Sequence, residues 1–259
     1  MDNDKVLALF DQQMREGARP ESPAARVERV GGVVRHFGPD PTWNGVIWSD
    51  LDEAGAEREI AAQVRHFTEL GREFEWKLYA HDTPGDLGER LMAAGFVPEP
   101  TEALMVAESA AQAGEVALAE GIELVPVTDE AGIDLMAAVH EQAFGTDSSR
   151  LARSMKLQLA EAPDTLVAVL ATAHGVPVSA ARMELIPGTQ FAGLWGGGTA
   201  EAWRGKGIYR ALVSYRARIA AERGYRYLQV DASDDSRPIL HRLGFAQLST
   251  TTPYLYELP

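Results

Sequence analysis

The sequence predicts an α+β protein that contains two copies of one arrangement, each a mixed and mostly antiparallel sheet flanked by helices. The first observation behind this prediction is a pattern present in both halves: an amphipathic helix, a glycine, a short aromatic strand, a polar loop, and a short helix ending in Gly-Phe. The second is a set of strand-like segments joined by tight turns, which precede one strand-to-helix crossover. A doubly wound fold, which needs repeated crossovers, is therefore not expected.

The internal repeat can be followed residue by residue. The first copy has a helix over 57–70, Gly71, a strand over 74–79 and Gly95-Phe96, and the second has a helix over 210–223, Gly224, a strand over 225–230 and Gly244-Phe245. Each helix has an apolar face with three- and four-residue spacing. The loops differ in length, so chance similarity between two α/β segments is the alternative interpretation.

A soft polar stretch between residues 108 and 121 separates the two copies. It predicts one domain over 1–115 and a second over 116–259. Within the second domain the expected elements are, in order, a strand over 122–127, helices over 133–144 and 149–159, a hairpin of 166–171 and 176–185 that turns at His174-Gly175, and a strand over 191–195.

Composition narrows the class of protein. The chain of 259 residues has no cysteine, which excludes disulfides, thiolate metal sites and a cysteine nucleophile, and no metal site is expected. A formal net charge of −14 with scattered Lys and Arg argues against a nucleic-acid surface. No apolar run approaches the roughly 18 residues of a membrane span, and no signal peptide is evident, so we expect a cytoplasmic protein without a membrane partner.

One segment is typical of a phosphate-binding site. A strand ends in Gly196-Gly197-Gly198, and a helix begins after a second glycine cluster at Gly205 and Gly207. Glycines let successive amides approach an anion, and a helix start adds unpaired N–H groups and partial positive charge. Arg204 and Lys206 add full charges. The alternative is a glycine-rich turn whose basic residues merely face solvent.

The sequence motifs of two common phosphate-binding loops do not match this glycine-rich segment. A G-x-G-x-x-G fingerprint starting at Gly196 needs a small residue where Glu201 stands. A Walker loop needs glycine and a hydroxyl residue where Ala200 and Gly207 stand. The segment from 204 to 209 instead resembles the acetyl-CoA motif of the GNAT superfamily of N-acetyltransferases, Arg/Gln-x-x-Gly-x-Gly/Ala, with Tyr209 at the last position. The resemblance extends over the whole second half, where Gly244-Phe245 stands at the position of the closing Gly-Phe of the family, before the last strands.

This resemblance implies a coenzyme site between two parallel strands that splay apart, 191–199 and 227–231. The backbone of Gly197, Gly198 and Thr199 is then expected to bind pantetheine. The pyrophosphate is expected at the loop and helix start, on Arg204, Gly205, Lys206, Gly207, Ile208 and Tyr209. Ser233 and Ser236 are further expected coenzyme contacts. The first half has an acidic segment, 47–54, in place of the glycines and is interpreted as a degenerate copy.

The resemblance does not identify which residues transfer protons in the reaction. Leu240 and Ser233 occupy the positions where family members often have a tyrosine acid and an asparagine. The remaining catalytic candidates are Glu184 on the strand before the site, Asp231 at the mouth of the splayed pair and Tyr254 on the last strand, where Tyr256 shares its face. For the carboxylates, a solvent-facing strand charge is the alternative. His140 and Glu141 either line the acceptor cleft or lie on a helix surface.

The sequence therefore predicts an N-acetyltransferase that moves an acetyl group from acetyl-CoA to a primary amine of a small molecule, such as an amine, amino sugar or antibiotic. Two alternatives stay open: a non-enzymatic acyl-CoA-binding or regulatory protein, which the absent tyrosine favours, and a transferase for protein amines. The acyl-chain length and a homodimer are also left open.

Overall fold

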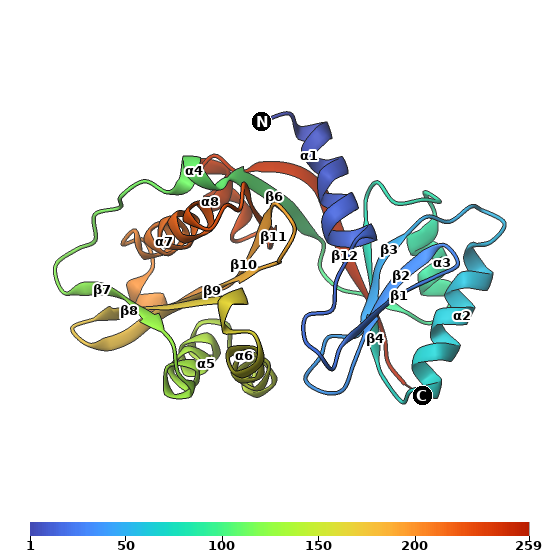
Figure 1. The fold of residues 1–259 in the computed structure, drawn as a ribbon, viewed down its shortest axis with the longest axis horizontal. Helices are drawn as coiled ribbons and strands as arrows, with labels where there is room; N and C mark the ends of the chain where they lie inside the picture. Colours follow the sequence, from blue (N-terminus) through green and yellow to red (C-terminus); the bar gives the residue numbers. More distant parts are fainter. Residues whose placement is uncertain (259) are drawn as a thin grey trace. The chain divides into compact units, whose positions relative to one another are not determined.

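The computed structural model describes residues 1–258 and contains two compact units (Figure 1). The first unit takes residues 1–105, Asp231–Arg242 and the segment that begins at Ala246; the second takes Val106–Val230 and Leu243–Phe245. The first unit thus includes the end of the chain, which the sequence assigned to the second domain. The domain border at residue 115 stays a prediction.

The first unit is a mixed sheet with helices on both faces. Its strand order is β1-β2-β3-β4-β12, and β5 pairs with β12. All of these pairs are antiparallel except β3 with β4, which α2 connects. The elements are α1 (Asn3–Phe10), a π-helical turn (Asp11–Glu16), β1 (Arg26–Val30), β2 (Val33–Phe37), β3 (Gly45–Ser49), α2 (Ala56–Glu69), β4 (Phe74–Tyr79), α3 (Leu87–Ala93), β5 (Val97–Pro98), β6 (Glu102–Glu108, to residue 105), α8 (Arg237–Arg242) and β12 (Ala246–Tyr256).

Alternation along β4 distributes its side chains between two layers. Phe74 and Trp76 face α2 and α3, where they pack in one cluster with Ile60, Phe67 and Leu91. On the opposite face, the ring of Tyr79 contacts Phe10 of α1 at 5.9 Å between centroids. The expected apolar face of the helix over 57–70 is thereby confirmed.

The second unit repeats this architecture. Its strand order is β11-β10-β9-β8-β7, antiparallel except for β10 with β11, which α7 connects. The elements are α4 (Ser109–Gln112), β7 (Ile122–Val127), α5 (Glu130–Phe144), α6 (Ser149–Glu161), a 3-10 turn (Pro163–Thr165), β8 (Leu166–Ala173), β9 (Val176–Leu185), β10 (Phe191–Thr199), a second 3-10 turn (Glu201–Trp203), α7 (Ile208–Glu222) and β11 (Tyr227–Ala232, to residue 230).

Helices cover both faces of the second sheet, with α5 and α6 on one side and α7 on the other (Figure 1). Leu170 and Ala180 pack under α5 and α6, whereas Val169 and Ala181 pack under α7. Each unit therefore has one parallel strand pair joined by a crossover helix in an otherwise antiparallel sheet. The predicted α+β class and the mixed sheets are confirmed.

The repeat extends to single glycines. Gly71 and Gly224, which follow the crossover helices, have φ of 64° and 84°, and Gly95 and Gly244 have φ of 99° and 92°. The left-handed region favours glycine because it lacks Cβ, so these positions mark the same chain reversals in both copies. Phe96 and Phe245, next to the second pair, are both buried.

The last strand does not stay with its own half of the sequence. β12 pairs antiparallel with β4 of the first unit, from Thr251 opposite Tyr79 to Tyr256 opposite Phe74. Conversely, residues 106–115 from the first half of the chain belong to the second unit, where Ser109 donates its backbone N–H to the carbonyl of Arg226. Each unit is thus completed by chain from the other half.

Candidate coenzyme site

The parallel pair of the second unit opens along its length. β10 pairs with β11 from Phe191 opposite Tyr227 to Gly193 opposite Gln229, and the pairing stops there although both strands continue. The edge of β10 beyond Gly193 is consequently left without β11 as its ladder partner. A strand edge of this kind can accept an extended ligand through main-chain hydrogen bonds.

A bulge shapes β10 at the glycine run. The register with β9 shifts between Trp195 and Gly198, and Gly196 has a φ of 60°. A Cβ on Gly197 would lie 2.9 Å from the ring of Tyr209, and one on Gly198 would lie 2.6 Å from the ring of Phe144. The glycines therefore make room for two of the chain's own aromatic rings, which gives the run a physical reason that the sequence alone did not supply.

The side chain of Ser179 fixes the end of β10. Its hydroxyl donates to the carbonyl of Gly198 at 2.7 Å and lies 2.8 Å from the hydroxyl of Thr199. Ser179 is fully buried on β9. This contact orients the backbone of the three residues that were predicted to bind pantetheine, Gly197, Gly198 and Thr199, and that role stays a prediction.

The loop before α7 presents a series of backbone donors. Gly205 and Gly207 have φ of 74° and 79°, and a Cβ at either position would meet nothing within 4 Å. The first helical hydrogen bond runs from the N–H of Ala211 to the carbonyl of Gly207. Within residues 1–258, the amides from Gly205 to Arg210 donate to no acceptor of the chain. Together with the helix dipole they form an open anion cradle.

The two basic residues of the motif behave differently. Arg204 donates from Nε to the carbonyl of Thr199 at 3.1 Å and from Nη2 to the carbonyl of Ala143 at 3.3 Å. It thereby ties the loop to the ends of β10 and α5. Lys206 is exposed, with its Nζ 5.2 Å from the ring centroid of Trp203. Arg204 thus has a bracing role that sequence reasoning missed, while Lys206 is accessible to an anion.

Ser233 and Ser236 lie in the turn before α8, in the part of the chain that belongs to the first unit. Their hydroxyls are 3.3 Å apart, and the carbonyl of Ser233 accepts the backbone N–H groups of Ser236 and Arg237. Ser233 is exposed and Ser236 is half-buried, and their contacts stabilise the start of a short helix. Their expected contact with coenzyme stays a prediction.

Glu184 lies on β9 opposite Gly193 of β10, at the residue where the parallel pairing ends. Its Oε1 accepts a hydrogen bond from Nε of Arg182 at 3.2 Å, and about a third of its side chain is exposed. Glu184 is therefore a half-buried, ion-paired carboxylate in the second unit.

Asp231 and Tyr254 belong to the first unit, so the structure does not group the three catalytic candidates in one unit. Asp231 is buried and bonds Nζ of Lys77 on β4 at 2.5 Å. Burial alone would lower the pKa of Lys77, but the Asp231 carboxylate outweighs it and the pKa is raised. Tyr254 packs with the α2 and α3 core, and its hydroxyl lies against Gly88. Both side chains have structural partners.

Leu240, at the position of the absent tyrosine, is fully buried in α8. It supplies no acid, in agreement with the sequence. Among residues 1–258 there is no cluster of three His, Asp or Glu side chains able to hold a metal ion. No helix in that range is long and apolar enough to cross a membrane.

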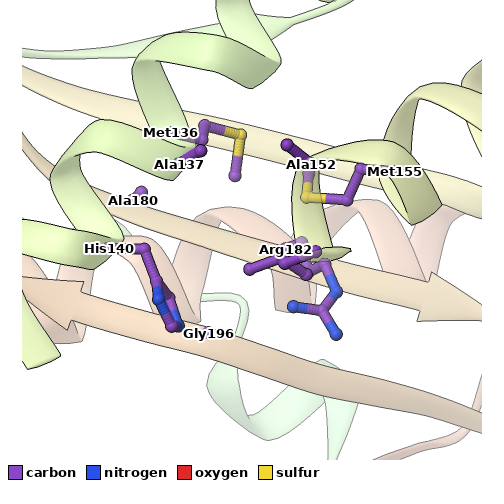
Figure 2. Close-up of a pocket in the computed structure, with 9 residues that line it drawn as sticks. Met136, Ala137, His140, Ala152, Met155, Ala180, Arg182 and Gly196 are labelled. Carbon is purple, nitrogen blue, oxygen red and sulfur yellow. The ribbon is translucent and has the colours of Figure 1, made fainter. Parts of the chain in front are cut away.

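Sequence reasoning missed Arg182. It lines an apolar cavity between α5, α6 and the sheet, together with His140 and Gly196 (Figure 2). A signal was present, because Arg182 and Glu184 are two charges with a spacing of two in an apolar hairpin strand, and that spacing places both on one face. His140 was considered, and the structure places it in this cavity rather than on an open helix surface.

Comparison with known proteins agrees with this geometry. Residues 133–245 match the model of the acetyltransferase (GNAT) family, which confirms the resemblance drawn from the motif. This segment includes the splayed strands, the loop and the start of α7. Searching the curated proteins gives no significant match.

Solved structures with low sequence identity share the whole fold. A GCN5-related N-acetyltransferase from Kribbella flavida has a TM-score of 0.71 at 18% identity over 99% of this chain and 95% of that one. A GCN5-related N-acetyltransferase from Sphaerobacter thermophilus has 0.62 at 15%, over 89% and 82%. A tandem GNAT protein from the clavulanic acid biosynthesis pathway has 0.61 at 13%, over 98% and 94%. The two-unit fold is thus that of known GNAT proteins.

Proposed function

We propose that the protein is an acetyl-CoA-dependent N-acetyltransferase that acetylates a primary amine of a small molecule, with the coenzyme bound by the second unit. The observation that carries this proposal is the run of unbonded amides from Gly205 to Arg210 at the start of α7. Six N–H donors beside Lys206 match the pyrophosphate of a coenzyme A thioester. The opening between β10 and β11 supports it, because an extended pantetheine arm fits between two parallel strands whose pairing ends at Gly193.

Different residues then bind the coenzyme, hold the pyrophosphate loop in place and transfer protons. Backbone groups of Gly197, Gly198 and Thr199 bind the pantetheine arm, and Arg204 keeps the pyrophosphate loop in place through Thr199 and Ala143. Attack of a neutral amine on the thioester carbon requires a proton acceptor and correct placement of both reactants. Glu184, Asp231 and Tyr254 are the candidates that the sequence provides for proton transfer, and Glu184 lies where the parallel strands part.

Titration calorimetry tests the coenzyme site. Acetyl-CoA should bind to the purified protein, whereas the acetyl thioester of N-acetylcysteamine, which lacks the pyrophosphate, should bind at least about 100-fold more weakly. Equal affinity for both ligands, or no affinity for acetyl-CoA, would contradict the proposed site.

A second candidate function is coenzyme binding without catalysis, which the buried Leu240 at the usual acid position favours. Steady-state thioester cleavage with a panel of small amines separates it from the first. Turnover supports the enzyme, and binding without turnover on any acceptor supports a regulatory protein. Peptides with free α-amines and lysines in the same panel test whether a protein amine is the acceptor.

A further inference from the structure

The cavity beneath α5 and α6 is almost entirely apolar. Its walls are Met136 and Ala137 of α5, Leu151, Ala152 and Met155 of α6, and Ala180 of β9 (Figure 2). Its volume is about 10 Å³, which is room for one water-sized or methyl-sized group. Methionine side chains adapt readily to a ligand, so two of them in the wall allow slightly larger groups.

Polar groups lie at one end of this cavity, against the bulge of β10. The ring of His140 approaches Gly196, whose Cβ position would be 3.9 Å from Cδ2 of His140 and 3.3 Å from Nη1 of Arg182 (Figure 2). Gly196 begins the glycine run of the proposed pantetheine site. An apolar cavity with a histidine and an arginine at its end thus adjoins the strand where the thioester is expected.

The surroundings of His140 keep its ring neutral. Burial lowers the pKa of His140, and Arg182 on β9 adds to this, while Glu141 on α5 opposes it. Nδ1 of His140 lies 2.9 Å from the hydroxyl of Ser148, which fixes the ring and leaves Nε2 as the other polar atom. The ring also contacts Phe144 at 4.4 Å, and the cavity residues of α6 carry no charge.

Arg182 has unused donors. Its Nε bonds Glu184, but Nη1 and Nη2 donate no hydrogen bond to any of residues 1–258. The side chain is 18% exposed, so these donors are accessible to a ligand. A guanidinium in this state is well suited to a carboxylate, which it binds with two parallel hydrogen bonds.

We propose that the acceptor is a short α-amino acid whose one- or two-carbon side chain enters this cavity between Met136 and Met155, while its carboxylate lies on Arg182 and its amine beside His140 at the polar end. This inference rests on the proposed acetyltransferase function and specifies its substrate class. An α-amino acid has an apolar side chain, a carboxylate and an amine on one carbon, and these match the apolar wall, the cationic Arg182 and the proton-accepting His140.

In the reaction, the neutral α-amine attacks the thioester carbon, a C–N bond forms and the C–S bond breaks. Nε2 of His140 takes the proton released from the nitrogen, and the departing thiolate is protonated by the imidazolium or by water. The cationic Arg182 disfavours both the ammonium form of the bound amine and the imidazolium of free His140, which keeps both groups reactive near neutral pH.

The test measures acetyl transfer to glycine, alanine, 2-aminobutyrate, leucine and alaninamide, with acetyl-CoA affinity determined in parallel. Alanine and 2-aminobutyrate should be the best acceptors, and alaninamide, which lacks the carboxylate, should lose about 30-fold in kcat/KM. Arg182→Gln should abolish this difference. Ala152→Leu should fill the cavity and lower kcat/KM for alanine about tenfold while sparing glycine.

His140→Gln should lower kcat about 100-fold or more with little change in KM, and should remove the loss of activity at acidic pH. The matched controls are Arg218→Gln on the exposed face of α7 and His241→Gln on α8, both of which should retain full activity. Unchanged acetyl-CoA affinity in the test variants shows that they are folded.

Acetyl-CoA binding without a preference for the carboxylate, or an unaltered preference in Arg182→Gln, overturns this inference but not the proposed function. Loss of the acidic limb in Glu184→Gln rather than in His140→Gln overturns the assignment of the proton acceptor. Absence of acetyl-CoA binding in the unmodified protein overturns the proposed function, and this inference with it.

Discussion

The two units have the same strand-to-helix connection, but the backbone N–H groups at the start of the helix have different hydrogen-bond partners in each. In the first unit, β3 leads through residues 50–55 into α2, and Oδ1 of Asp52 accepts the backbone N–H of Gly55 at 2.6 Å. In the second unit, β10 leads through residues 200–207 into α7, whose first amides bond nothing in the chain. In the first unit the N–H groups of Gly55 and Ala56 both bond to Asp52, whereas in the second unit six consecutive amides, Gly205 to Arg210, bond nothing in the described chain.

This difference comes from the residue types at the two helix starts. An aspartate near a helix start satisfies its donors and places negative charge where an anion would lie. Glycines with basic neighbours do the reverse. In the first copy the carboxylate of Asp52 therefore places negative charge at the helix start, where it would repel an anion.

The largest expected effect comes from placing an aspartate in the loop before α7, as the loop before α2 has at Asp52. Gly207→Asp should weaken acetyl-CoA binding at least about 100-fold, because a carboxylate then faces the pyrophosphate. Gly207→Asn, which has the same shape without the charge, should lose much less, since asparagine tolerates positive φ. Calorimetry measures both.

Gly224→Asp is the matched control for this prediction. Gly224 also has positive φ, with nothing within 4 Å of a Cβ, and it follows the opposite end of α7. Its substitution introduces the same strain and the same charge away from the loop, and acetyl-CoA affinity should be unchanged. Unaltered affinity in Gly207→Asp would contradict the assignment of the loop.

The second prediction concerns how α7 holds the bulged strand. Arg216 of α7 is buried, and its Nη1 donates to the carbonyl of Arg182 at 2.7 Å and to that of Trp195 at 3.5 Å. Burial lowers the pKa of Arg216 to about 10. Arg216→Met should reduce the free energy of unfolding by about 2 kcal/mol because buried carbonyls lose their donors, as measured by urea denaturation.

Arg216→Lys retains a cation and one strong donor, so it should recover part of this stability. Arg210→Gln, also on α7 but with an exposed side chain, serves as the structural control and should leave stability unchanged. Equal stability of Arg216→Met and the unmodified protein would show that the bulge does not depend on α7.

The third prediction removes the aspartate side chain from the loop before α2. Asp52→Ala removes the side-chain acceptor for Gly55 and leaves only the longer bond to the carbonyl of residue 52, so it should destabilise the first unit by about 1 kcal/mol in thermal unfolding. Asp50→Ala is the matched control, because only the backbone of Asp50 makes a hydrogen bond, to Gly32. If the two substitutions destabilise the protein equally, the aspartate does not cap the loop in the way described.

The last prediction tests a buried carboxyl of the first unit that lies away from its loop. Burial, with Asp231 nearby, raises the pKa of Glu102 to about 7. When folding raises the pKa of a carboxyl, the folded protein becomes less stable as the pH rises from the ordinary pKa of that group to its raised pKa, here about 7. Glu102→Gln should therefore stabilise the protein at pH 8 by about 1 kcal/mol, allowing for its partial exposure, and the gain should vanish by pH 5.

Denaturant unfolding at the two pH values measures this difference. Glu123→Gln, an exposed glutamate on β7, is the control and should show no dependence on pH. A gain for Glu102→Gln that is the same at both pH values would attribute it to something other than ionisation.

Much of this architecture could be predicted from residue patterns. The strand over 122–127 has the predicted bounds, and the helices over 57–70 and 210–223 begin one or two residues earlier than predicted. Glycines that require positive φ, such as Gly71 and Gly224, marked the ends of those helices reliably. Local rules of this kind depend only on neighbouring residues, which the sequence displays.

The unpredicted features all depend on long-range partners. Alternation along residues 246–256 identifies a strand but not the strand it pairs with, so the pairing of β12 with β4 was invisible. For the same reason Glu184, Asp231 and Tyr254 were selected by residue type, while their contacts with Arg182, Lys77 and Gly88 emerge only from the fold.

The exchange of end segments between the halves has a consequence for how the chain can be divided. A fragment that stops at residue 115 lacks β12, and so exposes the edge of β4 with its ladder donors and acceptors unpaired. We therefore expect either half to aggregate when it is expressed alone, and soluble protein to require that both segments are produced together.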